Sequence, residues 1–144
     1  MLVRQILAMK GGNEVVTINA GIPVSEAARI LSEKRIGTLV VKGEGGGPEG
    51  ILSERDIVRE LGRRGENCLN DLVAGLMTKD PVTCGPGDSA DHVLTKMTEG
   101  RFRHMPVVED GAMVGLISIG DVVKARLSEP SMEKEALEGM IKGF

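Results

Sequence analysis

The chain has 144 residues, of which 41% are hydrophobic, and its formal net charge is −3. This length fits one domain or two small ones, and the core must be aliphatic because the chain has no Trp or Tyr and only two Phe. The charge excludes a general attraction to nucleic acid or to anionic membranes, and aromatic side chains that stack on RNA bases are scarce.

The first half of the chain predicts the order helix, strand, helix, strand, strand, helix. One or two helical turns at 3–7 end before Gly11, a strand covers 15–18, and a helix follows Pro23. Strands at 37–42 and 50–52 are joined by a glycine-rich loop, and a further helix begins at Ser53 and ends near Gly62 or Gly65.

The second half repeats this order after a separate helix, predicted at 67–78. A strand at 82–83 precedes a helix that Asp88 or Ser89 caps. A hairpin of 102–108 and 113–117 turns at Asp110-Gly111, and the next helix runs from Ser118 through Leu127.

An internal duplication explains this order. Gly, Ser and Asp recur at one offset, since 115−50, 118−53 and 121−56 all equal 65. Before the hairpin the offset is 66, as 82−16 shows, so one hairpin loop is a residue shorter than the other. We therefore divide the chain into a first repeat with its N-terminal helix (1–66), a second repeat (67–128) and a C-terminal helix (129–144).

The C-terminal helix is predicted from a break at Pro130 and a cap at Ser131. Its apolar stripe, spaced i, i+3, i+4 and i+7, consists of Leu137, Met140, Ile141 and Phe144. This stripe can fold back on its own module or pair with a second chain, and we expect a homodimer.

Several patterns that suggest other functions do not hold. The G-x-G-x-x-G at 45–50 leads into a strand, whereas a dinucleotide fingerprint opens a helix. Leu116 stands where a hydrolase elbow needs Gly, and His92 and His104 lack zinc-ligand spacing. We predict no enzyme activity and no metal. The N-terminal stretch is too short for a membrane span, and Cys68 and Cys84 are read as reduced thiols of a cytoplasmic protein.

The doubled unit resembles a tandem pair of cystathionine-β-synthase (CBS) domains. The resemblance covers residues 3–127 and includes the entry motif Leu76-Met77-Thr78, the strand Arg101 to Val108 and the stretch Ser53 to Val58. It implies an α/β fold in which two β-α-β-β-α repeats stack about a pseudo-twofold axis, with short N-terminal and C-terminal helices.

The resemblance also implies clefts that bind adenosine compounds: AMP first, then ADP, ATP, NAD or S-adenosylmethionine. The family's ribose-binding pair falls on Ser53/Asp56 and Ser118/Asp121. A carboxylate can accept hydrogen bonds from both ribose hydroxyls, and a helix N-terminus attracts phosphate. Ser-x-x-Asp is also an ordinary helix cap, so the residues alone leave both readings open.

The remaining candidate ligand residues lie on the strands and early in the helices. By resemblance Arg103 and His104 face phosphate, and because the first repeat has Gly37 and Thr38 at these positions, the site of Asp121 is expected to bind more tightly. The other candidates are Met105, Pro106, Thr83, Arg55, Thr17, Thr38 and Lys124. The predicted function is a non-catalytic energy- or ligand-sensing module that acts on an unidentified protein. The alternative is a constitutive assembly module whose clefts stay empty.

Overall fold

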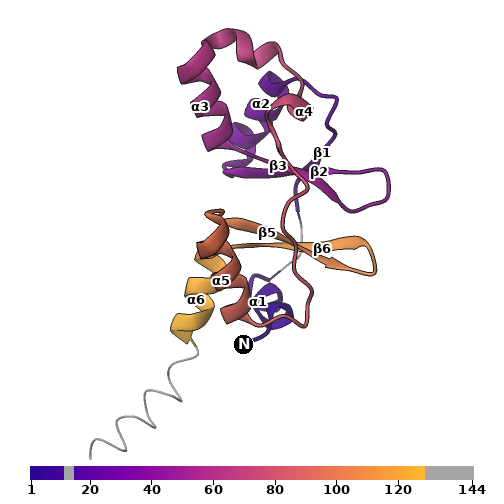
Figure 1. Ribbon diagram of the computed structural model, residues 1–144, viewed down its shortest axis with the longest axis vertical. Coiled ribbons are helices and arrows are strands. Elements are labelled where there is room, and N and C mark those ends of the chain that lie inside the picture. The colour runs from indigo at the N-terminus through magenta and orange to yellow at the C-terminus, as the bar shows by residue number, and fades with distance from the viewer. Residues whose placement is uncertain (12–14, 129–144) are drawn as a thin grey trace, which may run out of the picture.

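The computed structural model describes residues 1–11 and 15–128, and it stacks two sheets face to face with helices on the outer side of each (Figure 1). The first sheet has the order β1 (Thr17–Ile18), β2 (Thr38–Lys42), β3 (Pro48–Ser53) and β4 (Thr78–Lys79). The second sheet pairs β5 (His104–Glu109) with β6 (Ala112–Ser118). This arrangement confirms the predicted α/β fold of two stacked repeats.

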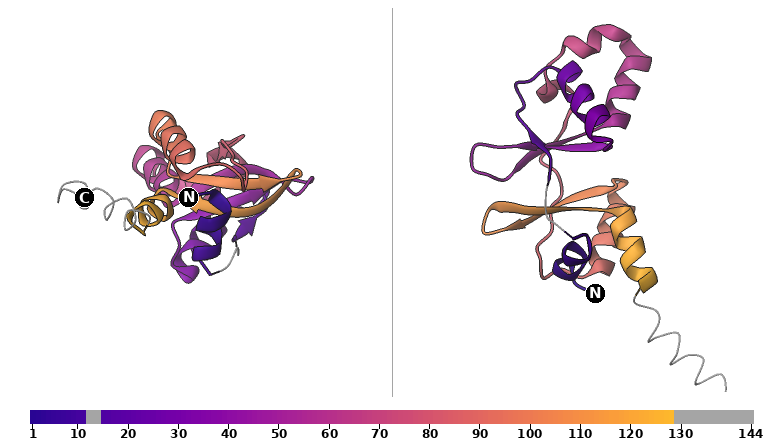
Figure 2. Two further views of the ribbon diagram at one scale, coloured as in Figure 1. Left: turned by 90° about the horizontal axis from the view of Figure 1, so that it is seen from below. Right: turned by 180° about the vertical axis from the view of Figure 1, so that it is seen from behind.

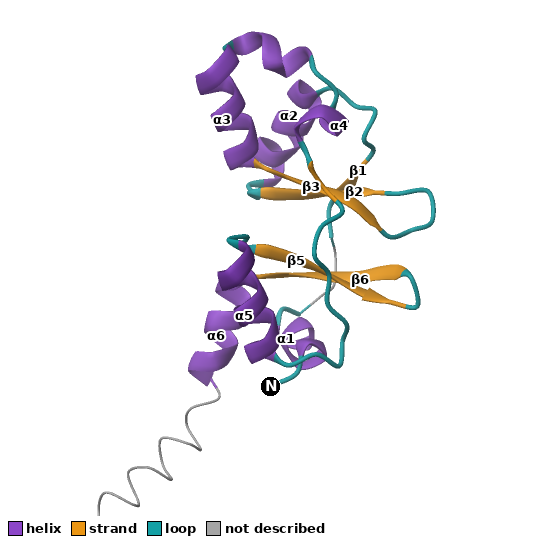
Figure 3. Cartoon of the chain, in the orientation of Figure 1, coloured by secondary structure: helices purple, strands orange, loops and turns teal. Residues whose placement is uncertain are grey.

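Each sheet has its own set of helices (Figure 3). The first sheet is covered by α2 (Val24–Lys34), α3 (Glu54–Arg64) and α4 (Val73–Leu76), and the short 3-10 helix η1 (Glu66–Asn70) connects the last two. The second sheet is covered by α1 (Val3–Met9), α5 (Ala90–Gly100) and α6 (Ile119–Ser128). The predicted C-terminal helix and its apolar stripe lie outside the described residues.

The two hairpins confirm the duplication at the level of strand register. Thr38 pairs with Ser53 and His104 pairs with Ser118, and the register shifts after Val41 in one hairpin and after Val107 in the other. After the shift, the next residue pairs are Lys42 with Pro48 in the first hairpin and Val108 with Met113 in the second. The second loop is therefore one residue shorter, and it turns at Asp110-Gly111, where both residues have positive φ.

The packing of α1 and α4 crosses the boundary that the sequence places at residue 66. α1 contributes buried side chains to the core of the second repeat, namely Val3, Ile6 and Leu7. Conversely, α4 and the residue after it contribute Val73 and Met77 to the core of the first repeat. Each repeat is thus completed by the segment that precedes the other repeat, as the view from behind also shows (Figure 2).

The backbone bonds of these two segments match each other. Val3 N donates to Asp88 O at 2.8 Å, and Val73 N donates to Ile22 O at 2.9 Å. Since 88−22 is 66 and 73−3 is 70, the helices α1 and α4 are equivalent by packing although their sequence offset differs from that of the repeats.

The glycine of each duplicated motif is explained by this exchange of segments, in which α1 packs on the second repeat, and α4 with Met77 packs on the first. A Cβ at Gly115 would lie 2.8 Å from Leu7 Cδ2, and a Cβ at Gly50 would lie 2.5 Å from Met77 Sδ. A side chain at either glycine would therefore displace the Leu7 or Met77 side chain that packs over the strand.

Two predicted elements are wrong. Residues 67–78 do not form one helix, because Asp71 is extended: its carbonyl accepts a hydrogen bond from Val24 N at 2.8 Å, and its side chain pairs with Arg64. No strand forms at 82–83 either. In the second repeat, the counterpart of β1 is a single parallel bridge between Cys84 and Val107.

Candidate functional site

The two Ser-x-x-Asp motifs begin α3 and α6 with closely similar geometry. Ser53 Oγ accepts from Asp56 N at 3.2 Å, and Asp56 Oδ2 accepts from Ser53 N at 2.9 Å and from Ser53 Oγ at 3.0 Å. In the second repeat, Asp121 N donates to Ser118 Oγ at 3.0 Å, while Ser118 N donates to Asp121 Oδ2 at 2.9 Å. Both motifs are therefore genuine helix caps, and the caps fix each carboxylate at the junction of strand and helix.

Asp121 borders a cleft of about 280 Å³, which we call the Asp121 cleft. It combines Ser118 and Asp121 of the second repeat with residues of the first repeat that lie at or just before the beginnings of its strands. Among the described residues, the lining is Leu7, Lys10, Val15, Val16, Ile36, Gly37, Thr38, His104, Leu116, Ser118 and Asp121.

Asp56 borders a second cleft of about 620 Å³, which we call the Asp56 cleft. Here Ser53 and Asp56 of the first repeat face residues of the second. The complete lining is Gly37, Thr38, Ile51, Ser53, Glu54, Arg55, Asp56, Arg59, Thr78, Asp80, Pro81, Val82, Gly100, Arg101, Phe102, Arg103 and His104.

Each cleft therefore combines the capped carboxylate of one repeat with residues at or just before the strands of the other. This corrects the expectation that Arg103 faces a ligand phosphate in the same cleft as Asp121. Arg103 lies in the Asp56 cleft, together with Arg55, Arg59 and Arg101. The reason is the pseudo-twofold axis, which places the beginning of β5 opposite the carboxylate of the first repeat.

Thr38 and His104 lie where the two repeats meet. Thr38 Oγ1 is 3.3 Å from both His104 Nδ1 and His104 Nε2. The two residues are equivalent in the duplication, since 104−38 is 66, and equivalent residues touch only close to the symmetry axis. Both residues line both clefts, so this pair is the wall that the clefts share.

The pKa of His104 is below its ordinary value of 6.5. Burial is the main cause, the negative charge of Asp121 opposes the shift, and the positive charges of Lys10 and Arg103 add to it. His104 therefore stays neutral near pH 7 and presents one donor and one acceptor to the clefts.

Sequence reasoning missed Lys10, which is the C-cap of α1. Its Nζ lies 2.9 Å from Asp121 Oδ2 and donates to the carbonyl oxygen of Leu116 at 2.8 Å. Burial raises the pKa of Asp121, but the hydrogen bonds and charge of Lys10, together with the bonds from Ser118, hold it below its ordinary value. Lys10 reaches this carboxylate only because α1 packs on the second repeat, which no local pattern indicates.

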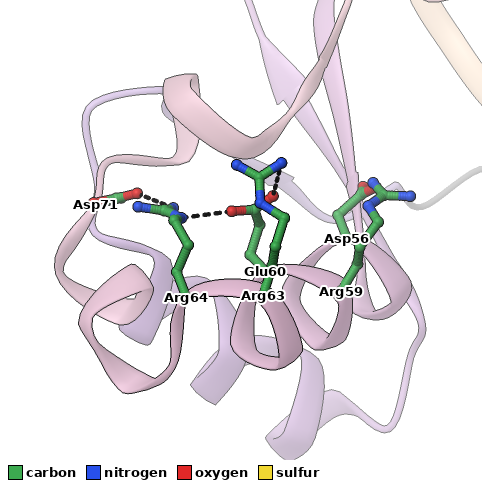
Figure 4. Close-up of polar contacts among 6 residues, drawn as sticks. All are labelled: Asp56, Arg59, Glu60, Arg63, Arg64 and Asp71. Atoms are coloured by element: carbon green, nitrogen blue, oxygen red, sulfur yellow. Dashed lines mark hydrogen bonds and ion pairs between the residues drawn. The ribbon is translucent and has the colours of Figure 1, made fainter.

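The arginines of the Asp56 cleft are arranged differently. Arg59 Nη2 donates to Asp56 Oδ1 at 2.7 Å along the same face of α3 (Figure 4). The side chains of Arg55, Arg101 and Arg103 are exposed, and among residues 1–11 and 15–128 none of them makes a hydrogen bond or an ion pair. Arg59 and Arg101 were also missed, since an exposed arginine within a helix or at its C-cap carries no local signal of a site.

The other predicted ligand residues separate into three groups. Arg55 lines the Asp56 cleft, as predicted, and Thr38 lines both clefts. Met105 and Pro106 are buried in β5, and Met105 belongs to the second core. Neither lining includes Thr17, Thr83 or Lys124, although Val16 and Val82 beside the two threonines do line the clefts.

Residues 1–11 and 15–128 contain no helix that is both long and apolar enough to traverse a bilayer. Within the same ranges, no three or more His, Cys, Asp or Glu side chains come together as metal ligands.

Comparison with known proteins gives a consistent result. The family model described as CBS domain matches residues 3–63 and 73–128. The CBS domain-containing protein CBSX3, mitochondrial, of Arabidopsis thaliana is 34% identical over 124 residues, which cover 83% of this chain. The chain spans 60% of the length of that relative, and 23% of the length of the Arabidopsis protein CBSCBSPB2.

Three solved structures are similar over most of the chain. A CBS-domain containing protein from Agrobacterium tumefaciens has a TM-score of 0.82 and 42% identity, covering 88% of this chain and 99% of that one. The CBS domain pair of protein MJ0100, in complex with 5′-methylthioadenosine and S-adenosyl-L-methionine, has a TM-score of 0.77 and 27% identity, with coverages of 90% and 98%. A CBS domain protein from Pyrobaculum aerophilum, complexed with AMP, has a TM-score of 0.73 and 26% identity, with coverages of 84% and 89%.

The duplicated strand-helix motif, the stacked repeats with composite clefts and these similarities lead to one assignment. The chain belongs to the CBS domain family and carries two CBS domains in tandem.

Proposed function

We propose that this CBS pair binds adenosine-containing ligands, adenine nucleotides first, and acts as a regulatory module without catalysis of its own. The observation that carries the proposal is the composite lining of the clefts. Each cleft combines the capped carboxylate of one repeat with residues at or just before the strands of the other. A ligand in such a cleft would contact both repeats at once.

The chemistry of the lining supports a nucleoside. The carboxylates of Asp56 and Asp121 are held at the cleft edge by their caps, where they can accept hydrogen bonds from ribose hydroxyls. Apolar side chains such as Val16 and Val82 line the same clefts and offer surfaces for a base. The complexes of the two similar proteins, with AMP and with S-adenosyl-L-methionine, support the same ligand class.

The regulatory mechanism follows from the position of the clefts. A ligand that bridges the repeats favours one relative arrangement of the two sheets over others, by its difference in affinity for them. A partner protein that contacts both repeats would sense this change. The buried, unpaired cysteines Cys68 and Cys84 are compatible with the cytoplasmic location that we propose for this activity.

Thermal unfolding with a panel of ligands tests the proposal. AMP, ADP, ATP, NAD and S-adenosylmethionine are each added to the wild type and to the double variant Asp56→Asn/Asp121→Asn. A ligand at 100 times its Kd stabilises the folded state by about 2.7 kcal/mol, so Tm should rise by several degrees in the wild type and by clearly less in the double variant. If no compound raises Tm, the proposal fails and the assembly module with empty clefts is favoured.

We propose further that the module is a homodimer, associated through α3 and α6. Val58 on α3 is 66% exposed, and on α6 its equivalent Val123 and the nearby Leu127 are 46% and 74% exposed. Apolar side chains at equivalent positions suit an isologous interface. Light scattering should give twice the chain mass for the wild type and a lower mass for Val58→Glu/Leu127→Glu. A monomeric wild type would refute the dimer.

A further inference from the structure

The two clefts differ in charge. Among the residues that the structure describes, the Asp56 cleft is lined by four arginines and three carboxylates, which gives 4−3 = +1. Within the same ranges, the Asp121 cleft is lined by Lys10 and Asp121, which gives 1−1 = 0 with His104 neutral. The more positive Asp56 cleft is also the larger of the two, at about 620 Å³ compared with about 280 Å³ for the Asp121 cleft.

The charges of the Asp56 cleft are available to a ligand. Arg59 is engaged by Asp56 at 2.7 Å, but Arg55, Arg101 and Arg103 have no partner among the residues that the structure describes. An arginine guanidinium is planar and always charged, and it binds phosphate oxygens in a bidentate manner. Glu54 and Asp80 line the same cleft, and their negative charges repel phosphate. The phosphate chain of a ligand would therefore bind near the three free arginines.

The cation of the Asp121 cleft is not available in this way. Lys10 Nζ is held both by Asp121 Oδ2 at 2.9 Å and by the carbonyl oxygen of Leu116 at 2.8 Å. Gly37, the equivalent of Arg103 in the first repeat, borders both clefts, and among the described residues no arginine lines the Asp121 cleft.

We infer that the clefts take ligands with different phosphate content. The Asp56 cleft binds an adenosine ligand with two or more phosphates, and the Asp121 cleft takes adenosine ligands that have no phosphate chain. This inference rests on the proposed function, since it specifies which adenosine ligand each cleft prefers.

Isothermal titration of the full chain tests the inference with adenosine, AMP, ATP and inorganic tripolyphosphate as probes. ATP should bind at least tenfold more tightly than AMP, and Arg103→Gln should weaken ATP about 10- to 150-fold, the range for a lost hydrogen bond to a charged group. Arg63→Gln is the matched control, because Arg63 lies on α3 outside both linings and is 70% exposed. Asp121→Asn should leave ATP binding unchanged.

The outcomes separate this inference from the proposed function. If adenosine compounds bind but AMP and ATP have equal affinity, the inference is overturned while the proposed function stands. Tripolyphosphate binding that Arg103→Gln does not weaken would also overturn it. If no adenosine compound binds, the proposed function fails and the inference falls with it.

Discussion

The two clefts arose from one duplicated unit, and the comparison between them separates what the duplication kept from what it changed. Both keep a Ser-x-x-Asp cap with nearly the same bond lengths, and both share the wall of Thr38 and His104. They differ in their basic residues: Arg103 lines only the Asp56 cleft, and its equivalent Gly37, which has no side chain to offer, borders both clefts. The cap stabilises the helix with or without a ligand, whereas the facing residues can change without loss of the fold.

The largest effect is expected from the side chains that complete each repeat. Leu7→Ala and Met77→Ala form a matched pair, because each side chain packs against the equivalent glycine of the opposite repeat. Each should lower the free energy of unfolding by about 2–5 kcal/mol. Hydrogen exchange should show Leu7→Ala loosening the second repeat and the Asp121 cleft, and Met77→Ala loosening the first repeat. The opposite assignment would disprove the exchange of segments.

The next largest effect concerns the two carboxylates. Asparagine keeps an oxygen for the cap and removes the charge, so Asp56→Asn should weaken ATP binding by about 1.5–3 kcal/mol. Asp121→Asn should have little effect on ATP, since its cleft has no free arginine. Calorimetric titration of both variants gives the order directly. A greater loss of ATP affinity from Asp121→Asn would restore the order expected from the sequence.

A smaller effect is expected from Lys10, which forms an ion pair with the Asp121 carboxylate that would accept hydrogen bonds from a ribose. A partly exposed ion pair contributes about 0.2–1 kcal/mol, so Lys10→Met should raise adenosine affinity at the Asp121 cleft up to about fivefold. The titration is done in the Asp56→Asn background, with Lys34→Met, on the exposed end of α2, as control. A fall in affinity would instead identify Lys10 as a ligand residue.

The smallest effect is the pH dependence of stability. The pKa of His104 is lower in the folded state than the 6.5 of an exposed histidine, so below pH 6.5 the unfolded chain binds more protons. Stability should therefore fall as pH drops from 6.5 toward the folded-state pKa, and His104→Gln should remove this part of the slope. Tm measured from pH 7.5 to 5 checks it, and an unchanged slope in the variant would exclude His104 as the source.

Much of the fold followed from local patterns. Ser53 and Ser118 cap their helices because a hydroxyl and a carboxylate three residues apart satisfy the first backbone donors wherever they occur. The hairpin at Asp110-Gly111 likewise depends on residues that tolerate positive φ. The exceptions were 67–78, where the backbone of Asp71 bonds to Val24, a residue distant in sequence, and 82–83, where the predicted strand is replaced by a single bridge between Cys84 and Val107.

The duplication can be recognised from a constant offset between identical residues, and the two caps with their carboxylates from residues three positions apart, so all of them follow from the amino-acid sequence. Tertiary packing is needed to learn that Arg103 shares a cleft with Asp56, that Lys10 reaches Asp121, and that α1 and α4 complete the opposite repeats. These contacts join residues between 27 positions (Gly50 and Met77) and 111 positions (Lys10 and Asp121) apart, and they depend on how the two similar repeats pack against each other. Local sequence patterns carry no information on that packing, because the whole chain sets it.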